Sequence, residues 1–388
     1  MIPYSRQSID EEDIQAVVDV LRSDFLTQGP VVEAFERELC RYTNAKYAVA
    51  CTNGTAALHL AMLALGVMHE DIVWTTPISF VASSNCALYC GAKIDFVDID
   101  LTTFNISISA LALKLEQAAL MGNLPKVVVV VHFAGNPVYL KDLKQLSDKY
   151  GFKIVEDACH ALGASYLGSK IGECRYSDIT VFSFHPVKSI TCGEGGALMT
   201  NNESFSIHAR LLANHGITKD PSYFKNESHG DWYYEQQALG FNYRLSDIHA
   251  ALGLSQMRKL DTFIEKRAEL VAWYQDKCKS LPVTFQNVDC ASDSAWHLLV
   301  VLVEKVDSRE AFYDFFREKG VGVQVHYVPI YTQPYYKRLN HEVIEMSATD
   351  EFYKRCITLP LFPLIDIVEA EKVVDCVRDF YTGADFKL

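Results

Sequence analysis

Short segments rich in β-branched residues alternate with helical segments through the first half of the chain, and this alternation limits the folds that the chain can adopt. Each short segment is apolar and bounded by Gly, Pro or Asp, which is typical of buried strands. Helical patterns such as 54–65 and 140–150 separate most of them, although little lies between the last two. The predicted strands are 45–51, 72–75, 94–97, 126–132, 153–156, 179–184 and 196–200. We therefore predict an α/β fold with a mainly parallel, seven-stranded sheet that helices cover on both faces.

The second half of the chain has a different pattern. A long helical pattern at 245–270 is interrupted only by Gly253. Beyond it, strand-like segments at 296–303 and 321–327 flank a helical pattern at 309–319. We expect a domain boundary near this long helix, which gives a large domain of residues 1–255 and a smaller α/β domain of residues 256–388.

Composition excludes several classes of protein. With 388 residues, of which 49% are apolar, the chain can bury large cores and is not disordered as a whole. Lys and Arg number 36 against 49 Asp and Glu, and the resulting net charge of −13, without a basic cluster, disfavours nucleic-acid binding. No apolar run is long enough for a signal peptide or a membrane span. The 11 Cys residues are scattered and include no CxxC pair, which predicts free thiols in the cytoplasm and no metal site.

Two carboxylates and a histidine follow a predicted strand in the segment 154–161, Ile-Val-Glu-Asp-Ala-Cys-His-Ala. An acid at the carboxyl end of a parallel strand faces the crevice in which α/β proteins bind ligands, so Asp157 is a candidate functional residue. Taken by itself, however, the segment is better explained by an Asp that caps the next helix.

A lysine follows another predicted strand in the segment 181–188, Val-Phe-Ser-Phe-His-Pro-Val-Lys, and the run 193–196, Gly-Glu-Gly-Gly, comes soon after. A lone Lys in a loop is usually solvated. Here the surroundings are apolar and rich in Gly, so that the backbone can approach a ligand closely. A Lys in such a pocket can lose its proton and form a Schiff base with a carbonyl group.

Small polar residues join a strand to a helix in the segment 51–57, Cys-Thr-Asn-Gly-Thr-Ala-Ala. The free N–H groups and the positive dipole end of such a helix can bind a phosphate, although a capped helix without a ligand explains this segment better on its own. The three segments together are far more specific than any one of them. A Lys for a Schiff base, an acid for a ring nitrogen and a helix N-terminus for a phosphate are the three contacts that a pyridoxal 5′-phosphate (PLP) enzyme needs.

The chain resembles the sugar aminotransferases of the DegT/DnrJ/EryC1/StrS family, which have the aspartate aminotransferase fold, fold type I of the PLP-dependent transferases. The resemblance extends over essentially the whole chain and rests on motifs in a fixed order. These motifs are 26–30 (LTQGP), 53–55 (NGT), 76–80 (TPISF), 156–160 (EDACH), 183–188 (SFHPVK), 194–196 (EGG) and 240–247 (GFNYRLSD).

The resemblance implies catalytic roles for three residues. Lys188 would hold PLP as a Schiff base and, once released, would move the proton between the substrate carbon and the cofactor. Asp157 would pair with the pyridine nitrogen and keep it protonated, so that the ring accepts electrons from a carbanion. His160 lies three positions further along the chain and would support the ring oxygen.

Five more residues match positions that contact the cofactor in the family. Gly54, Thr55 and Ser183 would bind the phosphate through backbone N–H and hydroxyl groups. Phe80 would stack on the ring, although a plain core aromatic remains an alternative. Asn242 matches a residue that reaches the phosphate from the other subunit, so the resemblance implies a homodimer with a shared active site.

Further positions match residues that lie near the nucleotide sugar in the family. They are Tyr4, Leu26, Thr27, His185, Arg244, His326 and Tyr327. Arg244 would pair with a diphosphate or with the carboxylate of glutamate. A structural histidine explains His326 equally well, and His185 either touches the substrate or only shapes its loop.

The segment 325–331 (VHYVPIY) narrows the resemblance to family members that act in pseudaminic acid biosynthesis. The implied reaction moves the amino group of L-glutamate to C4 of a UDP-2-acetamido-2,6-dideoxy-β-L-arabino-hex-4-ulose, giving UDP-4-amino-4,6-dideoxy-N-acetyl-β-L-altrosamine. The alternatives are amination of another nucleotide-linked 4-ketosugar, either the D-xylo 4-ulose of the bacillosamine route or a dTDP-sugar, and a non-catalytic regulator that binds PLP. A nicotinamide-dependent oxidoreductase is disfavoured because the turn at 53–55 is not part of a GxGxxG motif.

Overall fold

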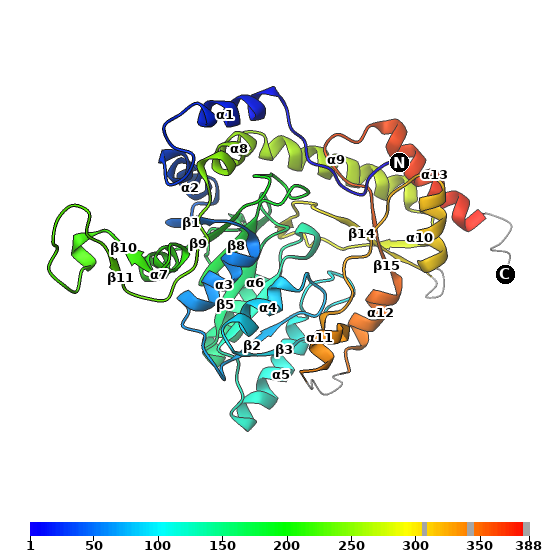
Figure 1. The fold of residues 1–388 in the computed structure, drawn as a ribbon. Coiled ribbons are helices and arrows are strands. Elements are labelled where there is room, and N and C mark those ends of the chain that lie inside the picture. Colours follow the sequence, from blue (N-terminus) through cyan, green and yellow to red (C-terminus); the bar gives the residue numbers. More distant parts are fainter. Residues whose placement is uncertain (305–308, 340–344, 383–388) are drawn as a thin grey trace.

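The main sheet has seven strands in the order β1-β9-β8-β5-β4-β2-β3 (Figure 1). The computed structural model describes residues 1–304, 309–339 and 345–382. The strands are β1 (Tyr47–Cys51), β2 (Ile72–Thr75), β3 (Lys93–Phe96), β4 (Val127–Val131), β5 (Lys153–Asp157), β8 (Ile179–Ser183) and β9 (Gly196–Thr200). Only β9 runs against its two neighbours, β1 and β8, and the other pairs are parallel. The predicted α/β fold and its mainly parallel sheet are therefore confirmed.

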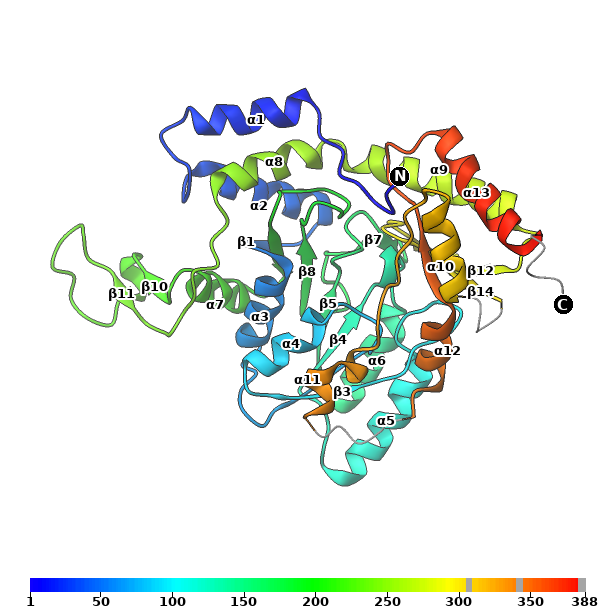
Figure 2. The same cartoon turned by 45° about the vertical axis from the view of Figure 1, so that its right-hand side comes forward.

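Helices cover both faces of this sheet because successive strand residues point to opposite sides (Figure 2). In β4, Val127 and Val129 belong to one core, while Val128 and Val130 belong to the other. The first core includes α3 (Gly54–Ala64), α4 (Ala82–Tyr89) and α7 (Glu203–Ala213). The second includes α2 (Pro30–Thr43), α5 (Ile108–Met121), α6 (Leu140–Tyr150) and α8 (Asp247–Met257).

The prediction of one continuous helix over 245–270 is wrong. The chain forms two helices, α8 and α9 (Leu260–Cys278), with Arg258 and Lys259 between them. Lys259 turns toward the N-terminal part of the chain, where its amine pairs with Asp13 at 3.0 Å. The break lets Met257 and Leu260, on either side of it, both pack into the core of the main sheet.

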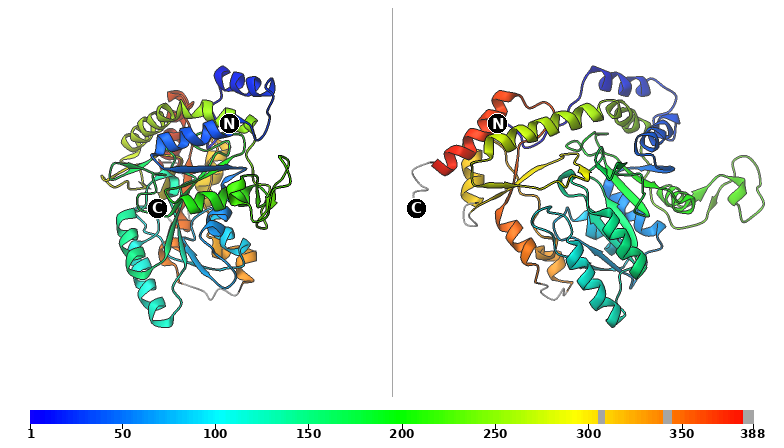
Figure 3. Two further views of the ribbon diagram at one scale, coloured as in Figure 1. Left: turned by 90° about the vertical axis from the view of Figure 1, so that its left-hand side faces the viewer. Right: turned by 180° about the vertical axis from the view of Figure 1, so that it is seen from behind.

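A second sheet of three antiparallel strands lies beside the main sheet (Figure 3). Its strands are β12 (Val283–Phe285), β14 (Leu299–Val303) and β15 (Cys356–Leu359), and its helices are α9, α10 (Arg309–Glu318) and α13 (Ile367–Thr382). Ile2 is buried in this core, so the N-terminus packs with the C-terminal part of the chain. The other face of β14 packs with residues of the main-sheet region, including Phe133. The division into residues 1–255 and 256–388 therefore stays a proposal.

Two predicted strand segments differ from the structure. The segment 321–327 makes only isolated bridges, from Val321 to Ile2 and from Gln324 to Thr358. The strand predicted from residue 296 begins at Leu299, because the N–H groups of His297 and Leu298 bond to a carbonyl outside the sheet. Residues of both segments line the cavity described below. The backbone there does not form the regular hydrogen bonds of a β-sheet.

The remaining elements lie around these two sheets. A hairpin arm, residues 217–240, extends away from the rest of the molecule (Figures 1 and 2). Across the described part of the chain, no helix combines the length and apolar character needed to span a membrane. The other elements are α1 (Glu11–Leu21), α11 (Pro334–Lys337), α12 (Ser347–Arg355), β6 (Ser165–Tyr166), β7 (Ser169–Lys170), β13 (Ser292–Asp293) and, in the arm, β10 (Ile217–Thr218) and β11 (Glu235–Gln236).

Candidate active site

A cavity of about 460 Å³ lies at the carboxyl ends of β5 and β8. We call it the central cavity. Its walls come from the start of α3, the segment before α4, the loop after β8, the N-terminal segment and the residues around 297 and 326. Of the residues predicted for the site, those that line it are Tyr4, Gly54, Thr55, Phe80, Asp157, His160, Ser183, His185, Lys188, His326 and Tyr327.

Lys188 presents an unpaired amine to this cavity. No described residue forms a hydrogen bond or ion pair with its Nζ atom. The loop is held by the Lys188 N–H, which donates to the His185 carbonyl at 2.9 Å, and by Phe184, which packs on Phe35. Burial lowers the pKa of the Lys188 amine, and the charge of Asp157 opposes this shift only in part. The lowered pKa favours the neutral, nucleophilic amine.

Asp157 ends β5 and is 5% exposed. Ser83 Oγ donates to Asp157 Oδ2 at 2.6 Å, and the Cys159 N–H donates to Oδ1 at 3.2 Å. Ser79 Oγ lies 2.6 Å from Ser83 Oγ. Among the residues placed by the structure, no Lys, Arg or His forms an ion pair with this carboxylate. Asp157 is therefore available to a cationic group of a ligand.

The N-terminus of α3 lies against Ser183 at the end of β8. Asn53 caps the helix, since its side-chain oxygen accepts from the Ala56 N–H at 2.8 Å. The N–H groups of Gly54 and Thr55 lie in the first turn, which has no intrahelical acceptor for them. A Cβ atom on Gly54 would lie 2.8 Å from Ser183 Cβ, so only glycine allows this approach. Two N–H groups, a hydroxyl and the helix dipole form a site suited to a phosphate.

His160 is buried and held as one tautomer. The Ala134 N–H donates to His160 Nδ1 at 3.3 Å, which leaves the proton of the neutral ring on Nε2. That Nε2 atom lies 3.3 Å from the Tyr327 hydroxyl. Burial, and next the charge of Lys188, hold the pKa of His160 well below its ordinary value. His160 is therefore a neutral donor at the cavity wall.

Aromatic side chains surround the other side of the cavity. The rings of Tyr4 and His326 lie 5.5 Å apart, and His326 Nδ1 lies 2.8 Å from Thr358 Oγ1. Burial lowers the pKa of His326 to about 3, so this ring is neutral as well. Phe80 is 59% exposed, and its ring lies 6.5 Å from that of Tyr327. Because Phe80 is exposed, it is not a plain core aromatic.

Four predicted site residues lie outside the central cavity of the single chain. Leu26 is exposed, and Thr27 forms a bridge with Ser246 at the start of α8. Asn242 is exposed beside the base of the hairpin arm. Arg244 donates through Nη1 to Asn214 Oδ1 at 2.7 Å. The structure of one chain does not bring these four side chains to Lys188.

Three residues of the site, Ser79, Ser83 and His297, were not predicted from the sequence. Ser79 lies in the segment before α4 and Ser83 in the first turn of α4, and nothing in the sequence links Ser83 to Asp157, 74 residues away. His297 is 2% exposed and lines the cavity, with its ring 4.5 Å from that of His160. Its position depends on the contacts that place β14 beside the main sheet, and no local pattern predicts these.

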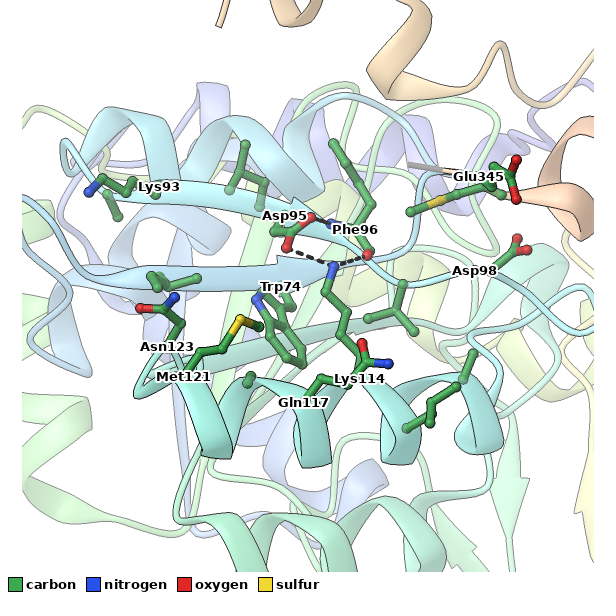
Figure 4. Close-up of a pocket in the computed structure, with 18 of the residues that line it drawn as sticks. Trp74, Lys93, Asp95, Phe96, Asp98, Lys114, Gln117, Met121, Asn123 and Glu345 are labelled. Atoms are coloured by element: carbon green, nitrogen blue, oxygen red, sulfur yellow. Dashed lines mark hydrogen bonds and ion pairs between the residues drawn. The ribbon is translucent and has the colours of Figure 1, made fainter. Parts of the chain in front are cut away.

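A larger hollow of about 1000 Å³ lies at the edge strand β3, and we call it the edge groove (Figure 4). Lys114 crosses it from α5, with its amine 4.9 Å from the Trp74 ring. The amine pairs with Asp95 at 2.7 Å and donates to the Phe96 carbonyl at 2.5 Å. Asp98 caps α12 by accepting from three groups of Ala348 and Thr349. These charged groups are already paired, so we assign no ligand to the edge groove.

The residues of the central cavity fit PLP. An amine without a hydrogen-bond or ionic partner among the described residues, a carboxylate without an ionic partner among them, and a phosphate site at a helix N-terminus border one space. Each matches a different part of that cofactor, namely its aldehyde, its ring nitrogen and its phosphate.

Comparisons with known proteins agree with this geometry. A UDP-4-amino-4,6-dideoxy-N-acetyl-beta-L-altrosamine transaminase of Campylobacter jejuni (strain 81-176) is 39% identical over 380 residues, which cover 97% of this chain and 96% of the relative. The structure of a Helicobacter pylori aminotransferase involved in the biosynthesis of pseudoaminic acid superimposes with a TM-score of 0.89 at 30% identity, covering 98% and 99% of the two chains.

A putative sugar aminotransferase of Streptococcus pneumoniae, solved in its PLP form, matches with a TM-score of 0.87 at 26% identity, covering 98% of each chain. The model of the DegT/DnrJ/EryC1/StrS aminotransferase family matches residues 7–378. This protein is thus a member of the DegT/DnrJ/EryC1/StrS aminotransferase family.

Proposed function

We propose that this protein uses PLP to transfer the amino group of L-glutamate to C4 of a UDP-2-acetamido-2,6-dideoxy-β-L-arabino-hex-4-ulose. The products would be 2-oxoglutarate and UDP-4-amino-4,6-dideoxy-N-acetyl-β-L-altrosamine. One observation carries the proposal: the unpaired Lys188 amine shares a cavity with the unpaired Asp157 carboxylate and the first turn of α3.

The proposed cofactor contacts follow from the chemistry of these groups. Lys188 would bind the aldehyde, Asp157 the protonated ring nitrogen, and Gly54, Thr55 and Ser183 the phosphate. Bound PLP supplies an aldehyde carbon that takes up the amino group and a ring that delocalises the electrons left on the substrate carbon. His160 would donate from Nε2 to the ring oxygen, since its Nδ1 atom already accepts from Ala134.

Lys188 is the proposed proton carrier in both halves of the reaction. Its neutral amine would take the proton from Cα of L-glutamate, and the Lys188 ammonium would later give a proton to C4 of the sugar. Glutamate thus loses its amino group and the Cα proton and gains a carbonyl oxygen from one water molecule. In the second half, C4 of the sugar gains the amino group and a proton, and its carbonyl oxygen leaves as water. Burial supports this role because it lowers the pKa of the Lys188 amine, which favours its neutral form.

The choice of sugar rests on the relatives and on the cavity mouth. The Campylobacter jejuni relative named for the altrosamine product aligns with 97% of this chain. Tyr4, Phe80, His326 and Tyr327 provide apolar ring faces and neutral polar groups, which suit a 6-deoxy sugar with an N-acetyl group.

We also propose that two copies form each active site. The hairpin arm exposes Trp232 by 77% and Leu239 by 84%, and such apolar surface is covered in most stable assemblies. Asn242 is exposed at the base of this arm, where it could reach the phosphate site of a second copy. Mixing Lys188→Ala with Asn242→Ala chains tests this, because mixed dimers would contain one intact site. We expect activity to reappear on mixing, and no recovery with verified subunit exchange argues against a shared site.

A cytoplasmic location is part of the same proposal. All 11 cysteines are free in the structure, and most are buried or half-buried. Free thiols are typical of a reducing compartment.

The visible absorption spectrum of the purified protein tests the proposed reaction. We expect a band from the lysine-bound cofactor, loss of the band after L-glutamate, and its return after the L-arabino 4-ketosugar. The D-xylo 4-ketosugar and a dTDP-4-ketosugar serve as comparison substrates in parallel samples. Return of the band with one of these alone would replace the proposed sugar, and absence of any band after added PLP would refute the proposal.

A further inference from the structure

We propose that Ser83 is a positioning residue for Asp157 and that Ser79 completes a hydrogen-bond chain from the wall of the central cavity to that carboxylate. This inference rests on the proposed function, in which Asp157 binds the ring nitrogen of PLP. Neither serine contacts that nitrogen in the scheme above, so both would act through Asp157.

The direction of each hydrogen bond in the chain follows from donor and acceptor chemistry. An ionised Asp157 can only accept, so the single hydroxyl proton of Ser83 must go to Asp157 Oδ2, 2.6 Å away. Ser83 can then only accept at its contact with Ser79, so Ser79 is the donor across 2.6 Å. The chain therefore runs from Ser79, which lines the cavity, through Ser83 to Asp157.

The hydrogen-bond chain from Ser79 through Ser83 matters because the side-chain torsion of an Asp does not by itself fix the plane of its carboxylate. The terminal torsion of Asp is broad and roughly two-fold, unlike the staggered torsions of an sp³ chain. Among the described residues, Ser83 Oγ donates to Oδ2, the Cys159 N–H donates to Oδ1 at 3.2 Å, and the Cys159 side chain also contacts this carboxylate. Two donors on different oxygens hold the plane in one orientation. Without Ser83, the contacts that remain among the described residues both come from Cys159.

Ser84 provides a matched control on the same helix. Ser83 and Ser84 are both fully buried in α4, so truncation of either removes the same atom from the interior. Ser84 Oγ lies 2.5 Å from the Tyr336 hydroxyl and 3.0 Å from the Val81 carbonyl, and it has no bond to Asp157. A purely structural effect of truncation should therefore appear in both variants, whereas an effect through Asp157 should appear only when Ser83 is truncated.

The experiment compares holoenzyme variants in the first half-reaction. We would follow the loss of the visible cofactor band after mixing with L-glutamate, with ordinary and α-deuterated substrate. Ser83→Ala should slow this step about tenfold, raise the deuterium effect and weaken PLP affinity, with little change in the apparent affinity for glutamate. Ser83→Thr keeps the hydroxyl and should restore most of the rate. Ser79→Ala should slow the step about threefold, and Ser84→Ala less than twofold.

The outcomes separate this inference from the proposed function. If the wild-type protein binds PLP and Ser83→Ala behaves like Ser84→Ala in rate and deuterium effect, the positioning role is wrong and the proposed function stands. If the wild-type protein binds no PLP, both fall together. If Ser83→Ala does not fold, Ser79→Ala decides, because an unchanged half-reaction in that variant overturns the chain.

Discussion

The central cavity and the edge groove each place a lysine near a carboxylate, yet only one of the two lysines is free. In the edge groove, Lys114 pairs with Asp95 at 2.7 Å and also bonds to a backbone carbonyl (Figure 4). In the central cavity, neither the Lys188 amine nor the Asp157 carboxylate has an ionic partner among the residues placed here. The lysine of the larger hollow is paired, and the lysine and the carboxylate of the smaller one are available to a ligand.

This difference shows that charged groups without an ionic partner identify a reactive site better than the size of a hollow does. A buried charge without a partner is unfavourable, and a fold keeps such a group where a ligand supplies the partner. Burial lowers the pKa of both Lys188 and Lys114. Only Lys188, however, has its amine free to react with a carbonyl group.

Removal of each lysine gives the largest expected contrast. Lys188→Ala should abolish turnover and the visible band of the bound cofactor, since no other amine lines the central cavity among the described residues. Lys114→Ala should leave both unchanged and only lower thermal stability, because its contacts lie within the edge groove. Spectra and steady-state rates of the two purified variants check this. Normal turnover in Lys188→Ala would remove the basis of the proposed mechanism.

Exchange of each carboxylate for an amide gives the next contrast. Asp157→Asn should lower kcat by about a hundredfold or more while the fold survives, because a neutral amide cannot hold a pyridine nitrogen protonated. Asp95→Asn should change kcat by less than twofold, since it removes only the partner of Lys114. Circular dichroism controls for folding in both variants. A rate near that of wild type in Asp157→Asn would exclude Asp157 from the mechanism.

The fold could be predicted because its strands carry their own signals. The five consecutive valines of β4 are buried on both faces, which is a pattern that parallel sheets produce locally. The segment 321–327 misled the same reasoning, because its β-branched residues make only single bridges to distant parts of the chain. The break at Arg258 and Lys259 was also missed, and the Lys259 amine there pairs with Asp13, which lies far away in the sequence. Tertiary contacts override the local pattern at both places.

The site was predictable to the extent that its motifs resemble those of a family, and the family assignment is confirmed. The residues that support Asp157 were not predictable in the same way. The role of Ser83 becomes visible only when the first turn of α4 reaches the end of β5, and that of His297 only when β14 lies beside the main sheet. The sequence around Lys188 indicated a reactive lysine, but it did not show that the amine lacks an ionic partner, whereas that of Lys114 pairs with Asp95.

The buried histidines around the central cavity should make the stability of the fold depend on pH. Burial lowers the pKa of His160, His297 and His326 around the central cavity, for His326 to about 3, whereas an unfolded His titrates near about 6.5. Below about pH 6.5 the unfolded chain therefore binds protons that the folded chain does not, and stability falls as the pH falls toward about 3.

Urea unfolding at several pH values measures this loss. His326→Gln should reduce the slope of stability against pH by up to about 1.4 kcal/mol per unit below about pH 6.5. The matched control is His69→Gln, because the His69 side chain is 80% exposed and does not line the central cavity. An equal slope in His326→Gln and wild type would show that this ring is protonated in the folded protein.

The smallest effect is expected in the edge groove, from Lys114→Met. The substitution keeps a flexible apolar side chain over Trp74 but removes the ion pair with Asp95 and the bond to the Phe96 carbonyl. The side chains of Lys114 and Asp95 are 23% and 32% exposed, so the pair is partly desolvated, and its attraction is offset by the cost of burying both charges. We expect the free energy of unfolding to change by no more than about 1 kcal/mol, measured by urea denaturation, with an unchanged kcat. Lys114→Ala, which also uncovers Trp74, should be the less stable of the two variants. If Lys114→Met instead lowered kcat, the edge groove would be coupled to the central cavity, and the contrast between the two lysines would have to be abandoned.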